Sequence, residues 1–162
     1  MKKVLLAALF CLLPALASCA KNTPIASNQE IVGCWERINF SEAANKQLNE
    51  AEPWPMPYQW FCFEPDGTLY SLMTSNYSKQ TSASLREAFL AIPKDVTYTL
   101  PQKGILITEQ KSAQQKLVWA AYFTGKKSEF DGKVIEKGTL FMALYSDKKK
   151  KNVYVRYLKK VS

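Results

Sequence analysis

From residue 30 onward, apolar and polar side chains alternate in short stretches, which is the period of a β-strand with one buried face. β-branched and aromatic residues are concentrated in the same stretches, as is typical of strands. The pattern predicts eight strands, at residues 31–40, 58–64, 68–75, 96–100, 104–110, 116–124, 138–146 and 152–161. Most links between them are short, so we expect sequential antiparallel pairing. Because eight strands can close on themselves, the expected fold is an eight-stranded antiparallel up-and-down barrel, with a half-open, strongly bent sheet as the alternative.

Two segments depart from the strand pattern. Ser84 and Glu87 have the spacing of a capping box, with Ser84 as the N-cap, and predict a short helix that Pro93 ends. Residues 41–52 carry a weaker helical spacing of apolar positions, and residues 53–57 then alternate proline with other residues, which predicts a stiff, extended loop. The chain is therefore expected to be all-β with one or two short helices placed across an end of the sheet.

The first twenty residues have a pattern of their own. Lys2 and Lys3 precede an apolar run of fourteen residues, from 4 to 17, which is shorter than the roughly 20 residues of a membrane-spanning helix and fits a secretory signal. The run ends in Leu16-Ala17-Ser18-Cys19, which resembles the lipobox of bacterial lipoproteins: a branched apolar residue, two small residues and a cysteine. An ordinary secretory signal with a nearby cleavage site is the alternative.

The lipoprotein resemblance implies a modified N-terminus. In that family the cysteine is acylated and the chain is cut just before it, so residues 1–18 would be the signal peptide, 19–29 a lipidated tether and 30–162 the barrel domain. The acyl chains on Cys19 would then hold the protein permanently in a membrane. Position 20 is alanine rather than the aspartate that retains such proteins in the inner membrane, so the resemblance implies the outer membrane of a bacterial envelope.

Composition and charge limit the classes of binding partner that we expect. The chain has 162 residues, 47% of them hydrophobic and 22% charged, which is typical of one globular domain. The formal net charge of +8 falls to +6 when Lys2 and Lys3 leave with the signal. Basic runs at residues 148–151 and 159–160 favour anionic lipid, lipopolysaccharide or another acidic polymer, or are simply a solvated turn. Nucleic acid is not expected as a partner of an exported protein.

Catalytic and metal-binding motifs are missing from the sequence. The chain has no histidine, which removes Ser-His-Asp and Cys-His catalysis and histidine-ligated metals. The carboxylates show no spacing that indicates an acid–base pair, and Asp66 and Asp131 each precede a glycine, as turn residues do. We therefore expect a protein that is not an enzyme and that has no cofactor and no metal.

Besides the acylated Cys19, two cysteines remain in the expected mature chain, Cys34 and Cys62. Both fall in predicted strands, and both would face an oxidising compartment. A disulfide is the favoured interpretation, which requires the two strands to be neighbours; two buried free thiols are the alternative.

Gly33-Cys34-Trp35, at the start of the first strand, resembles the G-x-W motif that opens lipocalins. The stretches 31–36 and 63–70 are similar to small bacterial lipocalin-like domains. The resemblance implies a lipocalin-like β-barrel in which Trp35 plugs the closed end and an arginine of the last strand, Arg156, packs over it.

Aromatic residues make up 12% of the chain and are the main clue to a binding site. Half of those on barrel strands face inward, where they either line an apolar cavity or fill a solid core. The predicted ligand-binding residues are Trp54, Met56, Tyr58, Trp60, Trp119, Tyr122 and Phe141. The function expected from them is binding of a small lipid or other apolar or amphipathic molecule; the alternative is an interaction module with a filled core that binds an envelope protein or an anionic polymer through its loops and basic surface.

Overall fold

The computed structural model describes residues 21–50 and 53–162. The signal segment, the lipobox and Cys19 therefore lie outside the described residues. Within the described ranges, no helix is both long enough and apolar enough to cross a lipid bilayer. The helices are α1 (Asn28–Ile31), α2 (Glu42–Leu48) and α3 (Ser82–Phe89). The strands are β1 (Thr23–Pro24), β2 (Gly33–Arg37), β3 (Tyr58–Phe63), β4 (Leu69–Thr74), β5 (Val96–Gln102), β6 (Ile105–Gln110), β7 (Gln115–Phe123), β8 (Ser128–Phe130), β9 (Lys133–Ile135), β10 (Leu140–Ser146) and β11 (Lys151–Lys160).

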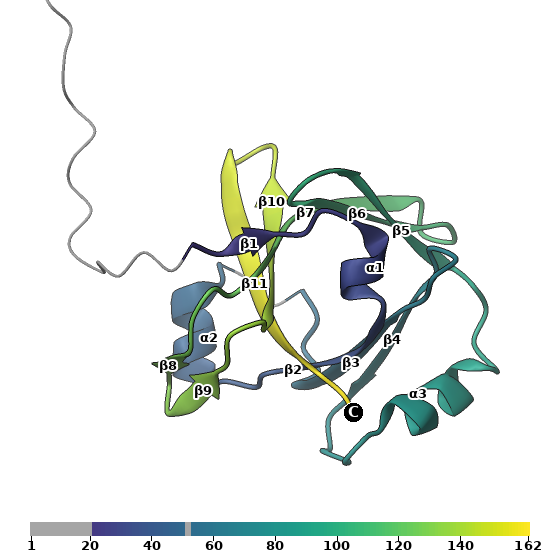
Figure 1. The fold of residues 1–162 in the computed structure, drawn as a ribbon, viewed down its shortest axis with the longest axis horizontal. Helices are drawn as coiled ribbons and strands as arrows, with labels where there is room; N and C mark the ends of the chain where they lie inside the picture. The colour runs from purple at the N-terminus through teal and green to yellow at the C-terminus, as the bar shows by residue number, and fades with distance from the viewer. Residues whose placement is uncertain (1–20, 51–52) are drawn as a thin grey trace, which may run out of the picture.

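Nine of these strands form one antiparallel sheet that curls strongly into a half-barrel, eight along its path and β1 paired with β7 (Figure 1). Its order is β4-β3-β2-β11-β10-β7-β6-β5, so the first and last long strands of the chain are neighbours. The ends of the path, β4 and β5, meet at an isolated bridge between Thr68 and Thr97 and at a hydrogen bond from the Tyr98 amide to the Gly67 carbonyl, 2.8 Å long. The half-open, strongly bent sheet is thus confirmed, and the fully closed barrel is not formed, because an isolated bridge and not a continuous ladder joins the two ends of the path.

The main core lies inside the curl of the sheet. Alternate residues of each strand point inward, as the period-two pattern predicts, and many of them are large. The buried members are Ile25, Ile31, Trp35, Phe61, Phe63, Tyr98, Leu106, Trp119, Ala121, Leu140, Met142, Tyr154 and Leu158. The inner face is therefore filled for most of its length by aromatic and aliphatic side chains.

A second apolar cluster lies on the outer face of β2 and β3, under α3. Cys34 and Cys62 are directly opposite each other on these strands and form a disulfide, with Cα atoms 4.1 Å apart. The predicted bridge is therefore confirmed. Leu85 and Phe89 of α3 pack on this cluster together with Trp60.

The start of α3 differs from the prediction. Its N-cap is Thr81, whose hydroxyl accepts a hydrogen bond from the Ser84 amide, while the Ser84 hydroxyl accepts one from the Thr81 amide. Ser84 is thus the N3 residue of the capping box and not its N-cap. The helix begins three residues earlier than expected because a serine at N3 can replace the usual glutamate.

A third cluster joins α2 to the β8–β9 hairpin. Ser41 caps α2 by accepting a hydrogen bond from the Ala44 amide and also donates to a carboxylate oxygen of Asp131 in the hairpin turn. Phe40 packs edge-on against Phe130. The predicted helix at 41–52 is therefore present in a shorter form.

Residues 23–31 belong to the folded body, which corrects the described part, 21–29, of the tether expected at 19–29. Thr23 and Pro24 pair with the end of β7, and Ile25 and Ile31 are fully buried. α1 lies across one end of the half-barrel (Figure 1), where the Trp35 indole donates a 2.8 Å hydrogen bond to the Ile31 carbonyl. Among the described residues, those from 23 to 29 therefore close this end of the sheet.

Trp35 and Arg156 do not meet as the lipocalin resemblance implies. The cation over the Trp35 ring is Lys160, with its ammonium 5.5 Å from the ring centroid. The Gly33 backbone has φ +126°, and a Cβ there would lie 3.3 Å from the Lys160 side chain, so only glycine fits comfortably at this point. Arg156 is two inward positions earlier on β11 and reaches a different set of rings.

Candidate functional site

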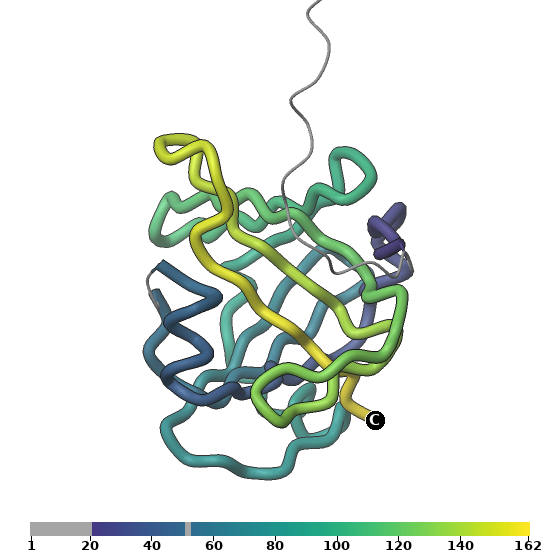
Figure 2. Tube along the Cα trace, turned by 90° about the vertical axis from the view of Figure 1, so that its left-hand side faces the viewer, coloured from purple at the N-terminus to yellow at the C-terminus, as the bar shows by residue number. Residues whose placement is uncertain are grey.

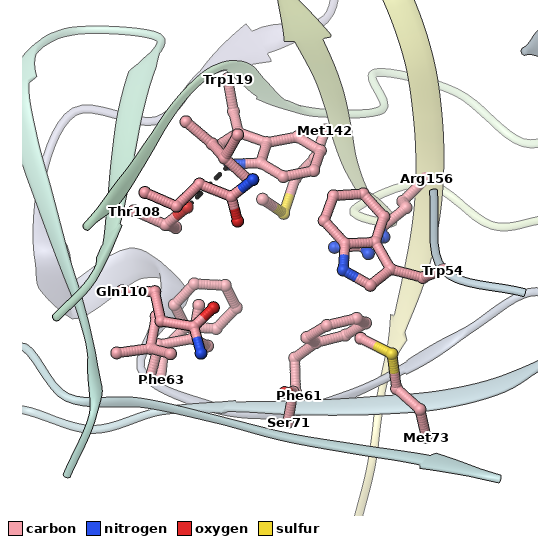
Figure 3. A pocket seen from close by; sticks show the side chains of 14 residues that line it. Trp54, Phe61, Phe63, Ser71, Met73, Thr108, Gln110, Trp119, Met142 and Arg156 are labelled. Carbon is pink, nitrogen blue, oxygen red and sulfur yellow. Dashed lines mark hydrogen bonds between the residues drawn. The ribbon is translucent and has the colours of Figure 1, made fainter. Parts of the chain in front are cut away.

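A cavity of about 100 Å³ lies inside the half-barrel, away from the end that α1 covers (Figure 3). Its walls come from seven strands and from the proline-rich loop before β3. The lining residues are Trp54, Phe61, Phe63, Leu69, Ser71, Met73, Val96, Thr108, Gln110, Gln115, Leu117, Trp119, Met142 and Arg156. The space is large enough for several water molecules or a small organic group.

The apolar walls follow from strand alternation. Phe61 and Phe63 are two positions apart on β3 and share its inner face, and Trp119 projects inward from β7. The Trp119 indole donates a 3.1 Å hydrogen bond to the hydroxyl of Thr108 on β6, which fixes the ring against the wall. An apolar guest would therefore meet rings on two sides.

Arg156 brings a positive charge to the cavity. Its side chain comes from β11 and is 5% exposed. The guanidinium carbon lies 4.0 Å from the ring centroid of Trp54, 4.6 Å from that of Phe61 and 5.1 Å from that of Trp119. Such distances are typical of cation–π contacts, so aromatic faces stabilise the guanidinium in a position where it can also attract an anion.

The proline-rich loop delivers Trp54 into the structure. Gln59 is fully buried, and its side-chain amide donates hydrogen bonds to the carbonyls of Trp54 and Met56, at 3.2 and 2.8 Å. Trp54 stacks on Trp119 with ring centroids 5.9 Å apart. Met56 points away and is 43% exposed. The loop thus supplies one ring to the cavity and leaves the other apolar side chain in solvent.

Two of the seven predicted ligand-binding residues, Trp54 and Trp119, meet at the cavity. The others lie elsewhere. Trp60 points to the outer face of β3 because successive residues of a strand point to opposite faces and its neighbour Phe61 points inward. Tyr122 and Phe141 pack against each other on the outer face of the sheet, with tilted rings whose centroids are 6.4 Å apart. Tyr58 packs against Tyr77 outside the cavity, and Met56 is the exposed loop residue described above.

Sequence reasoning missed the polar groups of the cavity. Figure 3 shows Thr108 and Gln110 on the side opposite Trp54 and Arg156. The signal that could have found them is the alternation of faces along a strand. On β6, Thr108 and Gln110 share one face while Ile107 and Glu109 lie on the other, and β6 pairs with the strand that carries Trp119. Once Trp119 is assigned to the inner face, the pairing register places both polar side chains there.

The carboxylates outside the cavity are held in turns. Asp66 accepts hydrogen bonds from the Lys94 ammonium and the Thr68 amide, at 2.7 and 2.9 Å, and these bonds hold its pKa well below the ordinary value. Asp95 accepts bonds from Ser112 and Gln110, which also lower its pKa. In the described ranges, no three histidine, cysteine or acidic side chains come close enough together to hold a metal ion.

The lysine run forms the turn between β10 and β11. Lys149 and Lys151 both contact the carboxylate of Glu50, and these two lysines lower the Glu50 pKa. Part of the positive charge at this turn is therefore neutralised within the protein.

No protein-family model matches the chain, and no curated protein or solved structure matches it either. The cavity, its charge and the surfaces around it are accordingly the observations that bear on function.

Proposed function

We propose that this is a lipid-anchored protein of the bacterial envelope that binds a small apolar or amphipathic molecule inside its half-barrel. The observation that carries the proposal is the cavity in which Arg156 faces aromatic walls. A solid interior would leave no volume beside the rings. The sequence supports the anchor through the lipobox that ends in Cys19, and the alanine at position 20 favours the outer membrane.

The cavity chemistry suits a ligand with an apolar body and an acidic group. Phe61, Phe63 and Trp119 provide ring surface, whereas Arg156 provides a charge that a carboxylate or phosphate can approach. Ionic hydrogen bonds to a buried guanidinium are strong because the site is shielded from water. The amides and hydroxyls on the opposite wall can bind a second polar group of the same molecule.

The present volume limits the size of the guest. Pockets for drug-sized ligands usually measure about 300–1,000 Å³, whereas this cavity measures about 100 Å³. A larger ligand therefore requires the Trp54 ring to leave its place over Arg156. We expect short-chain acids to fit the cavity as it stands and longer amphiphiles to displace the ring.

Native mass spectrometry of the processed chain, extracted from its own envelope in a mild detergent, tests the proposal. A co-purifying small molecule, lost in an Arg156→Met variant and retained in a Phe141→Ala variant, is the expected result. Phe141 is a suitable control because its ring lies on the outer face of the sheet. A clean unliganded mass for the parent protein, together with no uptake of short alkyl carboxylates, would remove the binding function.

One observation favours the second candidate, an interaction module. Leu90, 86% exposed, and Ile92, 42% exposed, follow α3 beside an open groove that is also lined by Phe89 and Tyr70. Exposed apolar side chains at such a groove are typical of protein-binding sites. Photo-crosslinking from position 90 in cells separates the candidates, since only the module function predicts a specific adduct that a Leu90→Asp change removes.

A further inference from the structure

The first described strand is fixed firmly to the half-barrel. β1 pairs with β7 just beyond the residues of β7 that pair with β6. The Ile25 amide donates a hydrogen bond to the Ala121 carbonyl, at 3.2 Å, and the Gly104 amide donates one to the Ile25 carbonyl, at 2.8 Å. Gly104 has φ +78°, and a Cβ there would come within 3.1 Å of the Pro24 side chain. The close approach of β1 thus depends on the missing side chain at Gly104.

Because β1 is attached to the half-barrel, only a short length of chain separates the folded body from the lipid on Cys19. The inference rests on the acylation of Cys19 in the proposed function. Four residue steps separate Cys19 from Thr23, the first residue of β1, and an extended chain spans at most about 3.6 Å per residue. The anchor can therefore be no more than about 14 Å from β1 along the chain. A body held this closely has one face beside the lipid headgroups.

The turns around β1 carry lysines. The Gly125 amide donates to the Asn22 side chain, at 3.3 Å, and the Gly138 amide donates to the Thr124 carbonyl, at 2.9 Å, so these turns lie beside the N-terminal segment. We call residues 21–24 and the turns at 103–104, 124–127 and 136–138 the β1 face. Its exposed basic residues are Lys21, Lys103, Lys126, Lys127 and Lys137.

The acidic groups near the β1 face leave a positive surplus. Glu136 pairs with Lys127, at 3.1 Å, and Glu30 accepts a hydrogen bond from the Ala26 amide. The residues that make up the β1 face thus include five lysines and one carboxylate, that of Glu136. Anionic phospholipids attract such juxtamembrane lysines, and the attraction acts within about one Debye length of the surface.

The lysine run at residues 148–151 lies at the other end of the molecule from the β1 face. β10 begins at Leu140, opposite Phe123, which pairs with Thr23, and it ends six residues later at Ser146 beside the lysine turn. Six strand residues span about 20 Å. In Figure 2 the β10–β11 turn and the N-terminal segment lie on opposite sides of the molecule.

We propose that the β1 face lies against the anionic phospholipid headgroups of the bilayer that holds the acyl chains. Chain length brings this face to the surface, and its charge favours contact. The β6–β7 turn and the polar end of the cavity at Gln110 and Gln115 are at the opposite end of these strands from Gly104, so they point into the aqueous space.

Lysine footprinting tests the orientation. The full processed chain is reconstituted into phosphatidylglycerol-containing vesicles, floated, and labelled with a membrane-impermeant amine reagent, with the same chain in neutral detergent as reference. We expect labelling of Lys103, Lys126 and Lys137 to fall at least about threefold in vesicles, as close headgroup contact excludes the reagent. Labelling of Lys111 and Lys148, in turns at the far end, is expected to stay unchanged.

A charge variant and a matched control sharpen the result. The triple change Lys103→Gln, Lys126→Gln and Lys137→Gln is expected to weaken the protection of Lys21, whereas the same change at Lys111, Lys148 and Lys150 is not. Chains that float but label equally at both ends would overturn the orientation and leave the anchor intact. Chains without acyl mass that fail to float would overturn the anchor and the orientation together.

Discussion

The guanidinium carbon of Arg156 lies 4.0 Å from the ring centroid of Trp54. This contact joins a loop of high proline content to the last strand of the sheet. Trp54 also packs against Tyr154, with centroids 5.2 Å apart. One side chain therefore closes a wall of the cavity and shields its charge.

Removing the ring is expected to open the cavity. Trp54→Ala should lower the free energy of unfolding by about 2 kcal/mol, roughly half the cost at a fully buried tryptophan, because Trp54 is half-buried. The same change should increase binding of an apolar fluorescent probe. Chemical denaturation and probe titration measure the two effects.

Met56→Ala is the matched control for Trp54, since both residues lie in the same loop and Met56 is exposed. Its unfolding free energy should stay within about 0.5 kcal/mol of the parent value. Equal probe binding by the Trp54 variant and the parent would show that the ring does not gate the cavity.

Arg156 is expected to determine ligand charge. Arg156→Met should reduce the preference for an alkyl carboxylate over the alcohol of the same length about tenfold, which corresponds to the loss of one ionic hydrogen bond. Calorimetric titration gives both affinities. The control is Arg37→Met, which removes a buried arginine that does not line the cavity; a similar loss of preference there would contradict the assignment.

The disulfide should make a large contribution to stability. The bridge between Cys34 and Cys62 closes a loop of 28 residues, and its reduction should lower the unfolding free energy by about 3.5 kcal/mol in the chain-entropy description. Denaturation with and without reductant measures the difference. A Cys34→Ala, Cys62→Ala double variant that is insensitive to reductant completes the test.

Loss of Cys19 should release the protein from membranes. In a Cys19→Ala variant the expected site of acylation is absent, so the exported chain should move to the soluble fraction. Membrane fractionation checks this, and continued membrane partition would argue against a lipid anchor at this residue.

Stability should vary little between about pH 5.5 and 8, because the chain contains no histidine. The depressed carboxyl pKa values of Asp66 and Asp95 stabilise the fold above about pH 4, and this contribution is lost as the pH falls toward their folded values. Urea midpoints measured across this range test the profile. Asp66→Asn should flatten the acid limb, and an unchanged slope would assign it to other groups.

The positions of the strands could be predicted because each strand has its own alternation of apolar and polar side chains. The 58–64 and 68–75 segments became β3 and β4. The bridge between Cys34 and Cys62 was predicted from the oxidising compartment expected for an exported protein, and it required their strands to be neighbours, as they are. Whether the sheet would close was harder to foresee, since it depends on how the α3 link spans β4 and β5, and no local pattern encodes that distance.

The site was predicted less completely for physical reasons. Density of aromatic residues does not reveal which face of a strand they occupy, so Trp60 and Tyr122 were grouped with Trp119 although they point outward. Ile25 stands in a polar segment, and its burial arises from tertiary contact alone. Arg156 was assigned to the wrong tryptophan because sequence order gives no measure of depth along a strand.

The isolated bridge between Thr68 and Thr97 joins the β4 and β5 ends of the sheet over a much shorter length than the ladders between the other neighbouring strands. Because backbone hydrogen bonds between β4 and β5 are so few, parting these two strands should cost less free energy than parting neighbours that share a full ladder, which makes this the place where the sheet is expected to open first.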